Sequence, residues 1–316
     1  MFLTIFKRSS FLSYTLSFIL IIFGSIYNFF KHENVKQEWL GIKVEFITQI
    51  FIGFILCMII NLVLDVIFKP LIHRKKKSSI SLLIFPLLFI SIPIYSIDIS
   101  YFLCSFLVLL SLTQMFKVSQ SNKDLNPILN SSVLIGSSIF IIKEVFIFLF
   151  FSWIILFFYK RLNFKTVFIS VFPIICFYLI SVSITIFSKS DTNYNTLFIL
   201  KFNWEYFSNF TLNQNRKFMA ITLMCLISFI YHFKLLKTRS LIYFSQFIVI
   251  IIYFILAIIF IMISNSEANG SEWIFIIIPA SVVISLLIDQ ISNKTVQEIS
   301  IIFILFLSLY DKIPIY

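Results

Sequence analysis

The sequence predicts an all-α fold, a polytopic bundle of about eleven transmembrane helices with a cytoplasmic N-terminus. Of its 316 residues, 60% are hydrophobic and only 12% are charged, whereas about a quarter of the residues in a soluble domain are charged. The apolar residues form long continuous runs without the polar alternation of a transmembrane barrel. The five glycines are never closely spaced, which excludes the glycine-rich phosphate loops of soluble Rossmann and P-loop enzymes.

Eleven apolar runs are candidates for helices that cross a hydrocarbon core about 30 Å thick. In chain order they are Phe11–Phe30, Phe46–Phe68, Ile80–Ile97, Ile99–Phe116, Ile128–Ile142, Val145–Tyr159, Val167–Phe187, Phe218–Phe233, Leu241–Ile263, Trp273–Ile288 and Ile299–Tyr310. The first run is longer than the core of a signal peptide and no small-residue cleavage site follows it, so we expect an uncleaved span. Residues 1–316 are therefore expected to form a single integral membrane domain.

Two of these assignments depend on tight hairpins. As one helix, Ile80–Phe116 would be about 55 Å long, so we divide it into two spans with Asp98 at the outer turn. Ile128–Tyr159 would be about 48 Å long, and each of its halves only about 22 Å. Either the turn at Lys143 and Glu144 is sunken below the outer face of the bilayer, or this segment is one steeply tilted helix. The second alternative reduces the number of spans to ten.

The charge distribution predicts the orientation. With a cytoplasmic N-terminus, most of the 25 Lys and Arg residues fall in inner connections, and most of the 14 Asp and Glu residues fall in outer ones. Basic residues favour the cytoplasmic side. The basic connector Lys69–Lys77 is then expected to attract anionic lipid headgroups. The net charge of +11 is accordingly interpreted as a feature of the inner leaflet, and no nucleic acid is expected as a partner.

No metal ion or cofactor is predicted. The four cysteines lie in four different apolar runs, without a C-x-x-C pair and without a histidine nearby. Zinc sites and redox pairs require such spacing, so the cysteines are expected to pack as small hydrophobic residues.

Asn61 and Asp65 are the clearest polar residues at membrane depth. Together with Cys57 they follow i, i+4 spacing on one helix face. Ionisable groups inside a membrane usually have a partner or a function. One interpretation is a contact with an ion or a headgroup inside the bundle, and the other is an ion pair between Asp65 and Lys69, four residues on.

Candidate substrate-binding residues come from two outer segments. If the second hairpin is sunken, Lys143 and Glu144 lie in a vestibule where Lys143 meets a substrate phosphate; alternatively, the pair neutralises itself at an interfacial turn. The segment Ser188–Lys217 is predicted as an aromatic interfacial loop on the outer side. Its candidates Trp204, Arg216 and Lys217 either clamp a lipid-linked substrate or belong to an aromatic belt.

Catalytic candidates are acids on outer connections. Multi-pass glycosyltransferases that use polyprenyl-linked sugars often place a carboxylate in the first outer loop, where it accepts the proton of the attacking hydroxyl. Glu33 and Glu38 occupy the corresponding loop here, without an adjacent acidic pair, and Asp98 is the third candidate. Solvated charges on connecting loops are the alternative interpretation.

Three stretches of the sequence resemble one family. They are Leu125–Ile180, with Asn130 and Gly136 before a short basic connector; Asn61 followed by a basic connector; and Ile276–Leu287, with Pro279, followed by polar residues and a last helix. This pattern resembles the uncharacterised multi-pass inner-membrane family of Bacteroidota known as domain of unknown function 6427. The resemblance implies a location in the bacterial inner membrane, as part of the cell envelope, and implies no catalytic residues.

Three functions are compatible with these observations. The first is an enzyme of envelope glycan assembly acting on polyprenyl-linked substrates, similar to multi-pass glycosyltransferases or polymerases. The second is a non-catalytic subunit or scaffold that binds other membrane proteins in an envelope complex. The third is a transporter, which requires discontinuous helices and polar groups near the membrane midplane. The sequence leaves open whether the protein is an enzyme.

Overall fold

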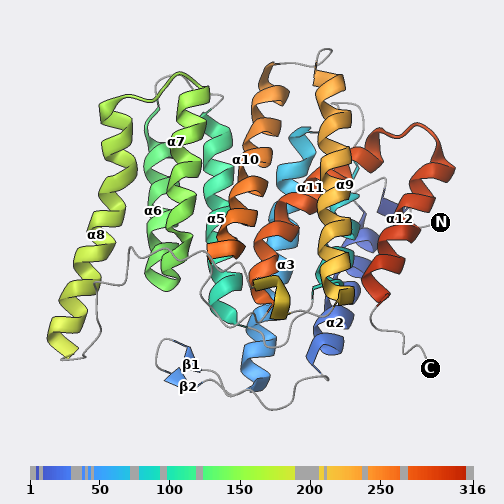
Figure 1. Ribbon diagram of the computed structural model, residues 1–316, viewed down its shortest axis with the longest axis horizontal. Helices are drawn as coiled ribbons and strands as arrows, with labels where there is room; N and C mark the ends of the chain where they lie inside the picture. The colour runs from blue at the N-terminus through green and yellow to red at the C-terminus, as the bar shows by residue number, and fades with distance from the viewer. Residues whose placement is uncertain are drawn as a thin grey trace. The chain divides into compact units, whose positions relative to one another are not determined.

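The computed structural model describes residues 5–6, 10–29, 38–39, 42–43, 46–71, 78–92, 98–118, 124–188, 206–209, 212–236, 241–263 and 270–310. These residues form an all-α fold, as the sequence predicts (Figure 1). The eleven α-helices of the described residues correspond, one for one, to the eleven apolar runs.

The α-helices, labelled as in Figure 1, are α2 (Phe11–Phe29), α3 (Phe46–Leu71), α4 (Ser81–Ile90), α5 (Ile99–Val118), α6 (Asn126–Ile141), α7 (Phe148–Phe158), α8 (Phe164–Ser188), α9 (Leu212–Leu236), α10 (Leu241–Ile263), α11 (Ile274–Gln290) and α12 (Lys294–Leu309). Three short 3-10 segments are η1 (Lys143–Ile147), η3 (Tyr206–Asn209) and η4 (Ser271–Trp273). The strands β1 (Glu38–Trp39) and β2 (Ile42–Lys43) form a two-stranded antiparallel hairpin, in which Glu38 pairs with Lys43.

The chain divides into two compact units. The first unit consists of Met1–Phe102, Glu205–Tyr243 and Ser266–Tyr316, and the second of Leu103–Trp204 and Phe244–Asn265. The first unit is therefore assembled from three separate stretches of sequence, and the two stretches of the second unit lie between them.

Helix α4 is central to the first unit. All ten of its residues are buried, and it packs against α2, α3, α11 and α12. Ten helical residues extend only about 15 Å, so α4 covers only part of the run Ile80–Ile97 that we assigned to a span. The helix ends where the backbone N–H of Ser91 bonds to Leu88, and Pro93 follows two residues later, as is common after a helix end.

In the second unit, α6 and α8 approach each other closely. A Cβ atom built on Gly136 of α6 would lie 2.8 Å from Cδ2 of Phe177 on α8 and 3.6 Å from the backbone nitrogen of Ile174. Helices in membranes associate through such small residues, because hydrocarbon provides no hydrophobic driving force between them.

The segment between α6 and α7 is a helical hairpin. Ile142 leaves the helical conformation, with φ −132° and ψ 110°, and η1 follows directly. Helix α7 then packs back against α6, and the two lie side by side in Figure 1. Of the two alternatives for Ile128–Tyr159, the structure has the pair of helices and not one tilted helix.

Four helical segments are long and apolar enough to cross a membrane. Among the described residues these are Ile99–Val118, Gln214–Phe233, Phe244–Ile263 and Ser271–Gln290. Five further apolar helical segments are shorter. This composition supports membrane insertion of the fold. Of the segment Ser188–Lys217, which we predicted as a loop, the residues from Leu212 onward already belong to α9, and Ser188 is the last residue of α8.

Replacing Gly136 with leucine should disrupt the packing of α6 on α8. The added side chain meets the Phe177 ring and nearby backbone, and overpacking of this kind costs about 1–3 kcal/mol. We expect a lower unfolding temperature in detergent. Val133→Leu on the same helix, where Val133 is 40% exposed, is the matched control. An equal unfolding temperature for both variants would contradict the close approach of the helices.

Candidate functional site

A buried acidic and aromatic cluster lies where η3 and η4 meet in the first unit. The Tyr206 hydroxyl donates a hydrogen bond to Oε2 of Glu272 at 3.3 Å, and the indole N–H of Trp273 donates to the Tyr206 oxygen at 3.2 Å. All three side chains are buried, and Glu272 is 0% exposed. An indole, a phenol and a carboxylate are thus joined in one hydrogen-bonded chain.

The local backbone places Glu272 at the start of α11. Gly270 has a φ of 81°, a left-handed conformation that costs glycine little and other residues more. The chain then enters η4, and the backbone N–H of Trp273 bonds to the Gly270 carbonyl at 3.2 Å. Because of this turn, Glu272 directs its carboxylate to Tyr206 from the N-terminal end of a helix, where negative charge is favoured.

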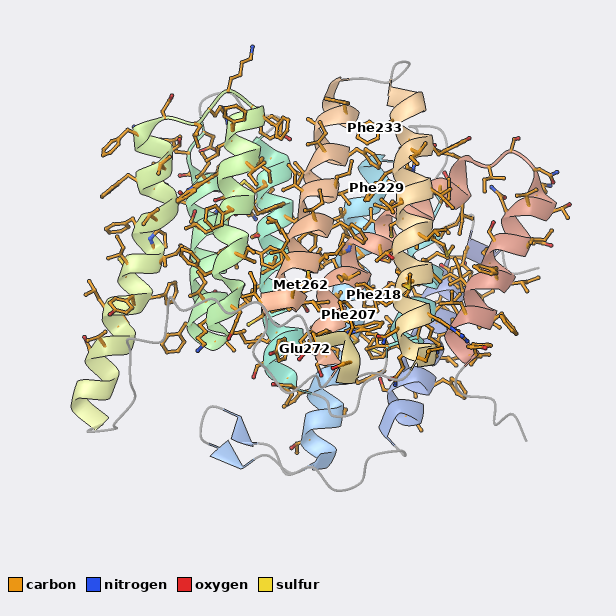
Figure 2. All side chains as sticks on the ribbon, viewed as in Figure 1. Phe207, Phe218, Phe229, Phe233, Met262 and Glu272 are labelled. Atoms are coloured by element: carbon orange, nitrogen blue, oxygen red, sulfur yellow. The ribbon has the colours of Figure 1, made fainter. Side chains whose placement is uncertain are left out.

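Aromatic rings hold η3 and the first turns of α9 against Trp273. The centroid of the Phe218 ring lies 5.0 Å from those of both Trp273 and Phe207. The Asn215 side chain donates to the Phe207 carbonyl at 2.8 Å, which fixes η3 to α9. Figure 2 shows Phe207, Phe218 and Glu272 at the same end of the bundle.

Burial raises the pKa of the Tyr206 phenol well above its usual value, and the negative charge of Glu272 raises this pKa further. The hydrogen bond from Trp273 acts in the opposite direction. The phenol therefore stays protonated at neutral pH and remains the donor to Glu272.

Asp98, a catalytic candidate from the sequence, lies beside this cluster. Its backbone N–H donates to the Ser271 hydroxyl at 3.2 Å, and Ser271 directly precedes Glu272. Its Oδ1 atom accepts a hydrogen bond from the backbone N–H of Ser100 at 2.9 Å. Unlike the buried Glu272, the Asp98 residue is only half-buried. The structure thus joins the Asp98 turn to the residue that directly precedes Glu272, although the two lie far apart in sequence.

Asn61 and Asp65 face the interior of the first unit, together with Cys57, and all three are buried. Asn61 donates through Nδ2 to the Ser17 hydroxyl at 2.6 Å. Asp65 accepts hydrogen bonds from the hydroxyls of Tyr14 at 3.0 Å and Ser81 at 3.4 Å. The Lys69 side chain, the alternative partner of Asp65, lies outside the described residues.

The remaining candidates do not form one site. Lys143 and Glu144 are half-buried in η1 of the second unit. In the first unit, Lys217 is buried and donates through Nζ to the Ser308 carbonyl near the end of α12, at 3.3 Å, while Arg216 is exposed. Glu33 and Trp204 lie outside the described residues, and of Glu38 only the backbone in β1 is described.

Glu272, Tyr206 and Trp273 are not among the site residues predicted from the sequence. The available signal was local: an acidic residue between Gly270 and a tryptophan, directly before a long apolar run. The tyrosine partner lies 66 residues away in the chain, and no local pattern indicates that distance. Among the described residues, no group of three or more His, Cys, Asp and Glu side chains is arranged to hold a metal ion.

The described residues thus belong to a protein of the all-α class, with helices long and apolar enough to cross a membrane and a buried carboxylate just before one of them. In comparisons with models of known families, with curated proteins and with solved structures, nothing matches this chain.

Removing the Tyr206 hydroxyl should destabilise the first unit. In Tyr206→Phe, Glu272 loses a buried donor and Trp273 loses its acceptor, and losses of this kind cost about 1–3 kcal/mol. We expect a lower unfolding temperature in detergent, partly restored in the double variant Tyr206→Phe with Glu272→Gln. The control is Tyr178→Phe, because Tyr178 is 39% exposed. If both single variants unfold alike, the cluster contributes nothing to stability.

Proposed function

We propose that this protein is an enzyme of envelope glycan assembly that acts on polyprenyl-linked substrates, with Asp98 as its general base. The observation that carries the proposal is the hydrogen bond between the Asp98 backbone and Ser271, which joins the Asp98 turn to the segment that holds the buried Glu272. Under the predicted orientation, both acids belong to outer connections, where polyprenyl-linked substrates are used.

The two carboxylates have different roles. In glycosyl transfer from a polyprenyl-linked donor, the acceptor hydroxyl attacks the anomeric carbon, the polyprenyl phosphate leaves, and a carboxylate accepts the hydroxyl proton. Asp98 suits the role of the base because it is partly accessible and Ser100 orients its Oδ1 atom. Glu272 is fully buried and hydrogen-bonded to Tyr206, so we assign it a positioning role.

We further propose that the chain is a multi-pass protein of the bacterial inner membrane, with eleven spans and a cytoplasmic N-terminus. The four membrane-compatible helices support membrane insertion, and the hairpin of α6 and α7 fits an odd number of spans. The resemblance to the Bacteroidota family supports the envelope location. Lys69–Lys77 then faces anionic headgroups on the cytoplasmic side.

A non-catalytic subunit of an envelope complex is the second candidate. The observation in its favour is the core, because the buried hydrophobic residues among the described ones are mostly Ile, Leu and Phe. A core of this kind suits a scaffold for other membrane proteins. The short buried helix α4 and the prolines inside α4, α8 and α11 are the features that favour a transporter, the third candidate.

Asp98→Asn should abolish glycan transfer while preserving the fold, because asparagine retains the oxygen that accepts from Ser100. Loss of a general base typically costs 10²–10⁴-fold in rate. We would measure lipid-linked glycan intermediates in a deletion strain that expresses each variant at the same protein level. The matched control is Asp124→Asn, because exposed Asp124 accepts an equivalent hydrogen bond from Asn126 two residues on. Normal glycan with Asp98→Asn would leave the non-catalytic subunit as the better interpretation.

The orientation can be tested by cysteine labelling in intact cells. On a background in which Cys176 is replaced by alanine, we place single cysteines at Asn163 between α7 and α8, and at Ser208 in η3, two exposed positions. We expect an impermeant maleimide to label Ser208→Cys and not Asn163→Cys. Labelling of Asn163→Cys alone would reverse the orientation.

A further inference from the structure

The connector between α7 and α8 in the second unit holds a lysine in an unfavourable backbone conformation. Lys160 has a φ of 54° and is the one non-glycine residue of the described part of the chain with a positive φ. Its N–H bonds to the Phe157 carbonyl at 2.9 Å, and the N–H of Arg161 bonds to the Leu156 carbonyl at 2.8 Å. These two bonds form a Schellman motif, whose left-handed position usually holds glycine. Because a side chain is costly there, the lysine at this position points to a use for its ammonium group.

Hydrogen bonds fix this connector to α5 and to α8. Arg161 donates through Nη1 to the carbonyl of Val118, the last residue of α5, at 3.1 Å. At the start of α8, the backbone N–H of Asn163 donates to the Thr166 hydroxyl at 2.9 Å, and this hydroxyl donates to the Arg161 carbonyl at 2.9 Å. The end of α5, the connector and the start of α8 therefore lie together, at one end of the second unit in Figure 1.

Three exposed lysines belong to this end of the second unit. Lys117 lies in the last turn of α5, Lys160 in the connector and Lys165 in the first turn of α8. Among the described residues, no ion pair or hydrogen bond joins any of these three side chains to a neighbour. Asp124, the acidic residue just before α6, accepts its hydrogen bond from the backbone instead. The region therefore carries a positive charge that the described part of the protein does not balance.

Exposed phenylalanines flank these lysines. Phe157 and Phe158 end α7 and are 67% and 55% exposed, and Phe164, which begins α8, is 88% exposed. Large apolar rings beside lysines are typical of a segment at the boundary between hydrocarbon and headgroups. There the rings enter the acyl chains, while the ammonium groups stay in the headgroup layer. The partner that fits both the rings and the charge is a lipid with a negative headgroup.

We propose that this end of the second unit binds an anionic phospholipid, with Lys117, Lys160 and Lys165 supplying the positive charge for its phosphate and the exposed phenylalanines contacting its acyl chains. Basic surfaces at the ends of membrane helices bind headgroups of this kind. The site is separate from the basic connector Lys69–Lys77, which belongs to the first unit, and it does not depend on the proposed glycan chemistry. The fixed backbone at Lys160 limits the positions that its ammonium group can reach.

The test is thermal unfolding of the full-length protein in a neutral detergent, with phosphatidylglycerol or phosphatidylcholine added to the micelles at increasing mole fraction. A ligand that binds only the folded state raises the unfolding temperature. We expect phosphatidylglycerol to raise it with a defined half-saturating mole fraction, and phosphatidylcholine to have a smaller effect. Identical curves for the two lipids would overturn the proposal. An equal rise with inorganic phosphate alone would also overturn it, because the site would then bind phosphate without a lipid.

Lys160→Gly separates binding from folding. Glycine adopts the left-handed conformation readily, so without lipid this variant should unfold at a temperature at least as high as that of the unaltered protein. Loss of one lysine near the headgroup should raise the half-saturating mole fraction of phosphatidylglycerol about fivefold. Half-saturation equal to that of the unaltered protein would show that Lys160 takes no part in binding and would overturn the proposal.

Two further variants test whether the effect is specific to this place. Lys165→Gln should also raise the half-saturating mole fraction about fivefold. The matched control is Lys294→Gln, because Lys294 is likewise exposed in the first turn of a helix, α12, but belongs to the first unit. We expect this control to bind phosphatidylglycerol like the unaltered protein. Equal shifts for Lys165→Gln and Lys294→Gln would indicate general attraction to a basic protein and would contradict a site at this connector.

Discussion

The need to satisfy polar groups without water is the constraint on which the rest of this structure depends. A helix in hydrocarbon satisfies its own backbone, but each polar side chain must find a partner within the protein. The many serines of this chain do so locally. Examples are the Ser132 hydroxyl, which donates to the Ile128 carbonyl one turn earlier, and Ser281, which donates to Ile278. Bonded in this way, serine behaves as a small residue that lets helices approach closely.

The charged residues cannot be satisfied by their own helix, and this determines where tertiary structure forms. Lys217 on α9 donates to a carbonyl near the end of α12, a favourable place for a positive charge. Glu272 is held by a tyrosine from another segment, and Asp65 by hydroxyls from α2 and α4. In each case one buried charged residue ties together separate elements. Apolar packing is non-directional by comparison, as between the rings of Phe85, Phe89 and Phe102 in the same unit.

The length and position of the helices could be predicted where the apolar run itself sets the ends. The run Leu241–Ile263 coincides with α10. The predicted helix was too short where the helix continues through polar residues. Helix α12 begins at Lys294 and not at Ile299, because the Asn293 side chain caps it by accepting a hydrogen bond from the N–H of Thr295. The predicted helix was too long for α4, which is buried by neighbouring helices. The Asp98 turn was predicted from a single acid between two apolar runs. The sequence did not predict that Glu272 lies near this turn, because the contact between Asp98 and Ser271 depends on how distant segments fold together.

The buried position of α4 has a consequence for the order of assembly. A ten-residue helix without a lipid-facing side is poorly suited to remain alone in a bilayer, so its environment must be built around it. Two of its four neighbours, α2 and α3, precede it in the chain and are synthesised before it. The other two, α11 and α12, are synthesised only after the second unit. The second unit, which lies almost entirely between these two groups in the sequence, can therefore mature during synthesis. The first unit must wait, with its central helix incompletely covered, until α11 and α12 have been synthesised.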